Sequence, residues 1–179
     1  GLELTGWTLE QIKILDPDWL FSLKKLIESQ KVELVGSGYS QLISPLVPFE
    51  VNKKNHVFGK EIYQSELDVL PKIALINEMA FSSGIVDILA DLEYQAFIMD
   101  ENNIVMASKE LESANTNKLI RAKGLGTAKL PILWSDSILF QKLQHYIHGD
   151  ISLEDYMNFF NSKLLLKRDV MPFYTNDAE

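Results

Sequence analysis

The segment Ile73-Ala74-Leu75-Ile76-Asn77-Glu78-Met79-Ala80-Phe81 passes from an apolar run to a single carboxylate. The run has the length and composition of a buried β-strand, and a helical pattern begins near Ser82 or Ser83. In α/β proteins, functional side chains gather at the carboxyl ends of parallel strands, where the backbone opens onto a crevice. Burying a charged carboxylate at such a point costs free energy, so its presence there suggests a functional role. The segment therefore predicts a strand, a loop and a helix, with Glu78 as the candidate catalytic centre.

Outward from this segment, short apolar runs alternate with helical patterns, which is typical of βα units and a parallel sheet. The expected strands are short and mostly apolar. They cover residues 2–5, 31–36, 73–76, 96–99, 130–134 and 170–174. The expected helices have apolar residues at helical spacing. They cover residues 17–27, 51–70, 83–92, 137–147 and 152–165.

Helical spacing also predicts which side chains are buried. In the helix over 17–27 the inward residues are Trp19, Leu20, Leu23, Leu26 and Ile27. In the helix over 51–70 they are Val57, Phe58, Ile62, Leu67 and Leu70.

The alternation is interrupted at 101–129, a polar segment with little apolar periodicity. We expect an excursion there, with a short β-ribbon around 104–106 and 118–121. A length of 179 residues suits one domain with a sizeable core. The sequence therefore predicts a single α/β domain over 1–179, and both ends look like those of a fragment.

Composition restricts the partners and the chemistry. A net charge of −8 argues against nucleic acids and anionic membranes as partners, because proteins bind both through Lys and Arg. A neutral substrate such as a sugar fits this charge better. No apolar run approaches the roughly 18 residues of a membrane span. The chain has no cysteine, which excludes disulfides, thiol catalysis and cysteine-ligated metals. We expect no cofactor, and a cytoplasmic protein, with a signal peptide already removed as the alternative. The sequence does not indicate the oligomeric state.

Asp177, like Glu78, follows an apolar run, so the two carboxylates would lie at the same rim of a parallel barrel. Two carboxyl groups on opposite sides of a sugar ring are the minimum for glycoside hydrolysis. The alternative is that strand ends simply carry polar residues, and from pattern alone this alternative is the stronger one.

Two further places carry candidate substrate-binding residues. The loop at 36–39, Gly-Ser-Gly-Tyr, lacks the spacing of either nucleotide-binding fingerprint. It is better interpreted as a tight active-site turn, with Tyr39 and Gln41 facing a ligand. Trp134 ends an expected strand just before Asp136. An aromatic ring there could stack on a sugar or belong to the core, and neither interpretation is favoured.

The histidines give no metal site. His145 and His148 are three residues apart on a helix, so they could share a face and bind a metal. No third ligand is clearly placed beside them, although Asp150 is close in sequence, and a solvated or interface pair is the preferred interpretation. His56 has no partner signature, and we assign it no role.

Three motifs together resemble one known family. The run at 32–48, Val-Glu-Leu-Val-Gly-Ser-Gly-Tyr-Ser-Gln-Leu-Ile-Ser-Pro-Leu-Val-Pro, resembles the second signature region of family-57 glycoside hydrolases. Asn77-Glu78-Met79-Ala80-Phe81 resembles their nucleophile motif, and Asn176-Asp177-Ala178-Glu179 resembles the motif that carries their general acid. The motifs occur in the family's order and span nearly the whole chain.

The resemblance implies a parallel (β/α)7 barrel, incomplete at both ends in this chain, and a retaining double displacement on α-glucans, as in amylases and 4-α-glucanotransferases. It implies that Glu78 is the nucleophile and Asp177 the general acid and base. Glu179 would be a substrate-site residue whose charge helps to raise the pKa of Asp177.

The chain departs from the family's pattern. Asn77, Met79 and Phe81 replace the usual Pro, Cys and Tyr, and the His-rich first motif has no counterpart. These departures indicate a divergent branch. They keep open a carbohydrate-binding relative without catalysis. A metal-dependent polysaccharide deacetylase, which has a related barrel, is the other alternative, but it uses an Asp with a His-x-x-x-His pair, and His145 and His148 have the wrong spacing.

Overall fold

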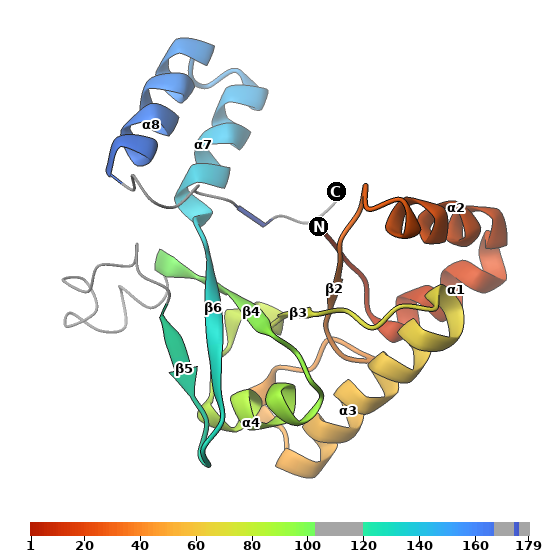
Figure 1. The fold of residues 1–179 in the computed structure, drawn as a ribbon. Coiled ribbons are helices and arrows are strands. Elements are labelled where there is room, and N and C mark those ends of the chain that lie inside the picture. Colours follow the sequence, from red (N-terminus) through yellow and green to blue (C-terminus); the bar gives the residue numbers. More distant parts are fainter. Residues whose placement is uncertain (103–119, 167–173, 176–179) are drawn as a thin grey trace. The chain divides into compact units, whose positions relative to one another are not determined.

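A computed structural model describes residues 1–102, 120–166 and 174–175 (Figure 1). The described residues form two compact units, which we treat separately. Unit 1 contains 1–98 and 121–132, and unit 2 contains the described residues of 99–120 and 133–179. The single domain expected over 1–179 stays a prediction.

A six-stranded sheet is the centre of unit 1, and the carboxyl ends of two of its strands continue into unit 2. Its strands are β1 (Leu2–Glu3), β2 (Leu34–Gly36), β3 (Ile73–Leu75), β4 (Ala96–Asp100), β5 (Arg121–Lys123) and β6 (Lys129–Ser135). Their order is β1-β2-β3-β4-β6-β5, and the first three pairs are parallel. Every residue of β2 and β4 is buried, as is usual for parallel strands covered on both faces. The predicted α/β class with a mainly parallel sheet is confirmed.

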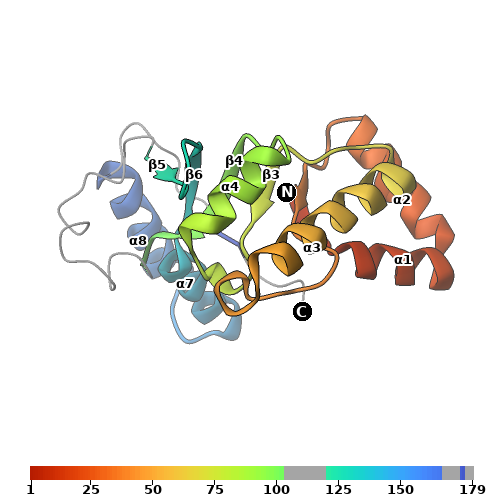
Figure 2. The same ribbon diagram turned by 90° about the horizontal axis from the view of Figure 1, so that it is seen from below.

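The helices alternate with these strands. They are α1 (Gly6–Leu15), α2 (Pro17–Glu28), α3 (Phe49–Ile62), α4 (Ser83–Asp91), α7 (Ser137–His148) and α8 (Leu153–Leu166). Asp16 caps α2, because its Oδ1 accepts a hydrogen bond from Trp19 N at 3.0 Å and Pro17 occupies the first turn. In unit 1, α1, α2 and α3 lie together beside β1 and β2 in both views (Figures 1 and 2). Among the described residues, no helix has the length and apolar character needed to span a membrane.

α1 was not predicted from the sequence, and the burial of α2 was overestimated. Leu20 and Leu23 are buried as expected, whereas Trp19 and Leu26 are each 41% exposed. The buried stripe of α2 is narrow because only one edge of the helix packs against α1 and the turn after α3. Together these elements close a core of apolar side chains and one tyrosine. Its buried members are Leu9, Leu20, Leu23, Leu34, Tyr63 and Leu67.

The helix expected over 51–70 is shorter, and its buried face was predicted only in part: Leu67 is 2% exposed as expected, and Val57 and Ile62 are half-buried. α3 ends at Ile62, a π-helical turn covers Tyr63–Leu67, and Asp68 ends it with a left-handed backbone. Phe58 is 51% exposed and Leu70 is 44% exposed. The buried residues of α3 are mostly polar instead. They are Asn52, Asn55, His56 and Gly59.

Part of the expected excursion is an ordered hairpin. β5 pairs with β6 in an antiparallel register that opposes Ala122 to Leu130. The carboxylate of Asp87 on α4 accepts a hydrogen bond from Leu125 N at 2.7 Å, which fastens the turn between the two strands. The first strand of the ribbon, expected at 104–106, and half of its second strand, expected at 118–121, lie outside the described residues. Of the strand expected at 170–174, only the last residue is described.

Candidate functional site

Glu78 lies directly after β3, in a 3-10 turn over Asn77–Met79. α4 begins at Ser83, which confirms the strand, loop and helix predicted from this segment. Glu78 is exposed, with φ 54° and ψ 18°, and Met79 follows with φ 50°. A left-handed backbone at a residue other than glycine costs about 1–3 kcal/mol, and such strain concentrates at functional sites. Glu78 and Met79 therefore form a strained bend at the carboxyl end of β3.

Neighbouring contacts hold this bend in place. Met79 N donates to Ile76 O at 3.0 Å, and the ring of Phe81 stacks on the buried ring of Phe97 with centroids 6.2 Å apart. The side chain of Asn77 donates to the carbonyl oxygen of Leu42 at 3.4 Å. This long contact joins the Glu78 bend to the loop that carries the candidates Tyr39 and Gln41.

The candidate loop residues Tyr39 and Gln41 differ in their surroundings. Gln41 is exposed, whereas Tyr39 is half-buried and its hydroxyl donates to Oε2 of Glu10 on α1 at 2.8 Å. The hydrogen bond to Glu10 raises the pKa of Tyr39, and desolvation adds to the effect. The structure thus links the loop of Tyr39 and Gln41 to the Glu78 bend through Asn77 and Leu42, and α1 supplies for Tyr39 a partner that was not predicted from the sequence.

A buried polar network lies beneath this loop. Ser37 is fully buried, and its N–H donates to the hydroxyl of Tyr63 at 3.0 Å, which in turn donates to Leu4 O at 2.7 Å. Ser37 Oγ also donates a short hydrogen bond to Glu3. Burial raises the pKa of Tyr63 to about 12, so this hydroxyl keeps its proton. The network fixes Ser37, at the start of the loop that carries Tyr39.

His56, to which the sequence analysis gave no role, belongs to this network. It is 5% exposed, and its Nδ1 lies 2.8 Å from the carbonyl oxygen of Ser37. Because a carbonyl oxygen only accepts hydrogen bonds, Nδ1 carries the hydrogen. Burial lowers the pKa of His56 to about 4, despite the opposing effect of this hydrogen bond. A signal was available in the sequence: Asn52, Asn55, His56 and Gly59 recur at i, i+3, i+4 and i+7, which is a polar stripe at helical spacing.

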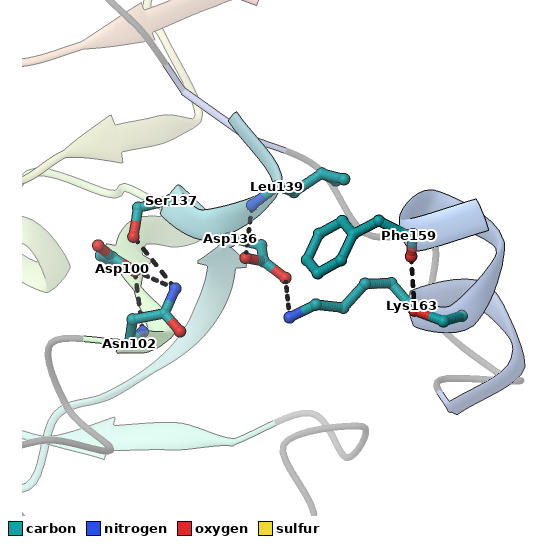
Figure 3. A network of polar contacts seen from close by, with 8 residues as sticks. Asp100, Asn102, Asp136, Ser137, Leu139, Phe159 and Lys163 are labelled. Atoms are coloured by element: carbon teal, nitrogen blue, oxygen red, sulfur yellow. Dashed lines mark hydrogen bonds and ion pairs between the residues drawn. The ribbon is translucent and has the colours of Figure 1, made fainter. Parts of the chain in front are cut away.

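In unit 2, Asp136 follows β6 and is only 2% exposed (Figure 3). Its Oδ1 accepts a hydrogen bond from Leu139 N at 3.0 Å and so caps α7, while its Oδ2 lies 2.8 Å from Nζ of Lys163 on α8. Burial alone would raise the pKa of Asp136, but Lys163 and the Leu139 N–H hold it below its usual value. Both carboxylate oxygens are engaged, so a substrate hydroxyl would have to share or displace these contacts.

Asp100 ends β4 near Asp136 and was not among the predicted site residues. It is 8% exposed, and its Oδ1 accepts from the backbone N–H of Asn102 at 2.9 Å and from its side chain at 3.3 Å. The same Asn102 amide donates to Oγ of Ser137 at 3.1 Å (Figure 3). Asn102 therefore connects the end of β4 to the first turn of α7.

Trp134 is half-buried, and its indole N–H is buried with no hydrogen-bond acceptor among the described residues. Its neighbour Ser135 accepts a hydrogen bond from Thr175 N at 3.0 Å, so Thr175 lies against the end of β6 within unit 2. Asp177 and Glu179 follow close behind in sequence but lie outside the described residues. The structure thus leaves the roles of Trp134, Asp177 and Glu179 as predictions.

The histidine pair of α7 is solvated, as preferred from sequence. His145 is exposed, and its Nδ1 lies 2.9 Å from Oδ2 of the exposed Asp150. Across 1–102, 120–166 and 174–175, no three His, Cys, Asp or Glu side chains are grouped so that they could hold a metal ion.

Comparisons with solved structures show the fold. The 4-α-glucanotransferase of Thermococcus litoralis is 19% identical with a TM-score of 0.65, covering 81% of this chain and 24% of that enzyme. The α-amylase AmyC of Thermotoga maritima is 17% identical with a TM-score of 0.54, covering 73% of this chain and 24% of that enzyme. A putative polysaccharide deacetylase from Mycobacterium smegmatis is 11% identical with a TM-score of 0.60, covering 95% of this chain and 54% of that protein. The predicted barrel type is therefore confirmed.

The chain spans about a quarter of the length of the first two enzymes. No curated protein matches it significantly. A family model described as glycosyl hydrolase family 57 matches residues 1–176. Because that match covers nearly the whole chain, the chain belongs to glycosyl hydrolase family 57.

Proposed function

We propose that the protein containing this chain is a retaining glycoside hydrolase or transglycosidase that acts on α-linked glucans. The observation that carries the proposal is the position of Glu78, exposed at the carboxyl end of β3 in a bend with two left-handed residues. Family membership supports it, and the similar structures include a 4-α-glucanotransferase and an α-amylase. Strain at an exposed acid beside a parallel strand end favours a chemical task for Glu78.

In the proposed mechanism, the carboxylate of Glu78 attacks the anomeric carbon while Asp177 gives its proton to the leaving oxygen. The products of this step are the shortened glucan and a glycosyl ester of Glu78. Asp177, now ionised, then takes a proton from water or from a sugar hydroxyl, which attacks the ester and restores Glu78. Water as the acceptor gives hydrolysis, and a sugar gives transfer.

The remaining candidates would hold the glucan. Tyr39 and Gln41 are proposed contacts from the loop joined to the Glu78 bend through Asn77. Trp134 would stack on a sugar face, and Asp136 would accept hydrogen bonds from sugar hydroxyls. Glu179 would add negative charge beside Asp177, which raises the pKa of an acid that must hold its proton.

The test uses the full-length protein with maltoheptaose. Glu78→Gln keeps the size of the side chain but removes the attacking charge, so turnover should fall at least about a thousandfold. Mass spectrometry of quenched reactions should find a glycosyl adduct on the unchanged protein and none on the variant, while maltoheptaose binding stays nearly intact.

Glu93→Gln is the matched control. Glu93 is also exposed and has a left-handed backbone, with φ 64°, but it precedes β4 rather than following a strand. This variant should retain full turnover. Undiminished turnover by Glu78→Gln would remove Glu78 from the mechanism. Binding of maltoheptaose without turnover, both before and after the change, would favour a non-catalytic carbohydrate-binding relative.

A further inference from the structure

The loop that carries Tyr39 and Gln41 is held by the start of α1 and by one side chain of α3. From α1, Trp7 N donates to Tyr39 O at 2.8 Å and Gly6 N donates to Gly38 O at 3.1 Å. Asn55 is 7% exposed, and its Oδ1 accepts hydrogen bonds from Ser40 N at 2.9 Å and from Ser40 Oγ at 3.2 Å. Its Nδ2 donates to Ser40 O at 3.0 Å. The amide therefore satisfies both backbone polar groups of the residue that separates Tyr39 from Gln41.

The backbone of α3 adds to this contact. The carbonyl oxygen of Asn55 accepts a hydrogen bond from Tyr39 N at 2.9 Å. A helical carbonyl normally accepts from the N–H four residues later, so this one is shared with the loop. Two glycines permit the close approach. A Cβ on Gly38 would lie 1.9 Å from Nδ2 of Asn55, and a Cβ on Gly59 would lie 2.8 Å from the carbonyl carbon of Gly38.

These contacts set the direction of the candidate binding residues. With Ser40 fixed on both sides and Tyr39 N engaged, the peptide planes on either side of Ser40 have little freedom to rotate. Glu10 then fixes the hydroxyl end of Tyr39. The Asn55 amide does not contact ligand in this arrangement, because it is buried and its atoms are hydrogen-bonded to Ser40.

We infer that Asn55 is a positioning residue, which holds the 39–41 segment in its glucan-binding conformation. The inference rests on the proposed function for the identity of the ligand. Asn55 acts through Ser40 and touches no substrate. Loss of its amide should leave the helix in place, because α3 also retains its contacts with α1 and α4, and should loosen the loop at Ser40.

The test compares Asn55→Ala with Asn52→Ala in the full-length protein. Asn52 is 3% exposed on the same face of the same helix, but it faces Ser44, whose Oγ lies 3.4 Å from its Oδ1. For cleavage of maltoheptaose, Asn55→Ala should raise KM about tenfold and change kcat less than about threefold, because the loop binds substrate equally in ground and transition states. Asn52→Ala should change neither value by more than about threefold. Asn55→Asp, which keeps the acceptor oxygen but loses the donor, should fall between Asn55→Ala and the unchanged protein.

Hydrogen exchange of the backbone amides supplies a readout that needs no glucan. The N–H group of Ser40 loses its acceptor in Asn55→Ala, so it should exchange faster there and not in Asn52→Ala. Equal rises in KM for the two alanine variants, or faster exchange with unchanged KM, would overturn the positioning role alone. If the unchanged protein neither binds nor cleaves maltoheptaose, the proposed function fails. Unchanged exchange at Ser40 in Asn55→Ala would separately show that Asn55 does not hold the loop.

Discussion

Lys163 and Asp136 form an ion pair, with Nζ of the lysine 2.8 Å from Oδ2 of the aspartate. The pair joins α8 to the residue that caps α7, and the carboxylate is 2% exposed whereas the lysine side chain is 21% exposed. A buried carboxylate without a partner is much more costly than a paired one, so the lysine stabilises the end of β6 by avoiding that cost.

Lys163→Met should therefore destabilise the protein by about 2–3 kcal/mol at pH 7, measured by urea denaturation. The pKa of Asp136 is lowered in the folded protein, so its stabilising effect is present at neutral pH and is lost as the pH falls through that lowered value. The difference between the proteins should accordingly shrink under acid conditions. Lys142→Met is the control, because both lysines lie over the ring of Phe159, at 5.9 Å and 5.5 Å, but only Lys163 reaches Asp136. Equal losses for the two variants would contradict this account.

His56 should make stability depend on pH in a different range. Its pKa falls from 6.5 when unfolded to about 4 when folded, so the unfolded chain takes up the proton first. Stability is then fully present above about pH 6.5 and declines by roughly 3 kcal/mol toward pH 4. His56→Gln should be less stable at pH 7 and show a flatter profile between these values, measured by urea denaturation at several pH values. A slope that survives His56→Gln would refute the assignment.

The hairpin of β5 and β6 offers a steric test. A Cβ on Gly124 would lie 2.2 Å from Oδ1 of Asp87, whereas a Cβ on Gly126 would lie 3.5 Å from the same atom. Gly124→Ala should therefore lower the free energy of unfolding by about 1–3 kcal/mol, and Gly126→Ala should cost less than 1 kcal/mol. Thermal unfolding measures both. Similar effects at the two glycines would show that Asp87 does not hold the turn closely.

Asp177→Asn tests the proposed general acid. Substrates with poor leaving groups need protonation of the departing oxygen, so their hydrolysis should slow most, while activated aryl glycosides should retain more of their rate in the glycosylation step. Rates are compared for an aryl α-maltoside and for maltoheptaose. Equal losses for the two substrates would count against an acid role for Asp177.

Much of the fold could be predicted from sequence, because the periodicity of apolar residues reports burial directly. The strands around Leu34, Ile73 and Phe97 were found for this reason, and so was the bend at Glu78. α1 was missed because its apolar residues do not form one stripe: Leu9 is buried in the core, whereas Ile14 and Leu15 are 74% and 81% exposed.

The part of the candidate site that sequence reasoning missed is polar and buried. Asn55 and His56 lie on the inner face of α3 because the loop beneath them presents backbone N–H and C=O groups, and these need hydrogen-bond partners. Because apolar residues are expected on the inner face of a helix, Phe58 was predicted to be buried although it is 51% exposed. Glu10 was missed for a related reason, since its partner Tyr39 is 29 residues away in sequence.

The central claim is that Glu78 and Asp177 form one retaining active site. The most direct measurement is the distance between their carboxyl groups in a crystal structure of the full-length protein. The account predicts about 5–5.5 Å across an open cleft, with both groups facing the same bound glucan. A separation of about 6.5–9.5 Å would indicate an inverting enzyme, and carboxylates that face different surroundings would contradict the proposed site altogether.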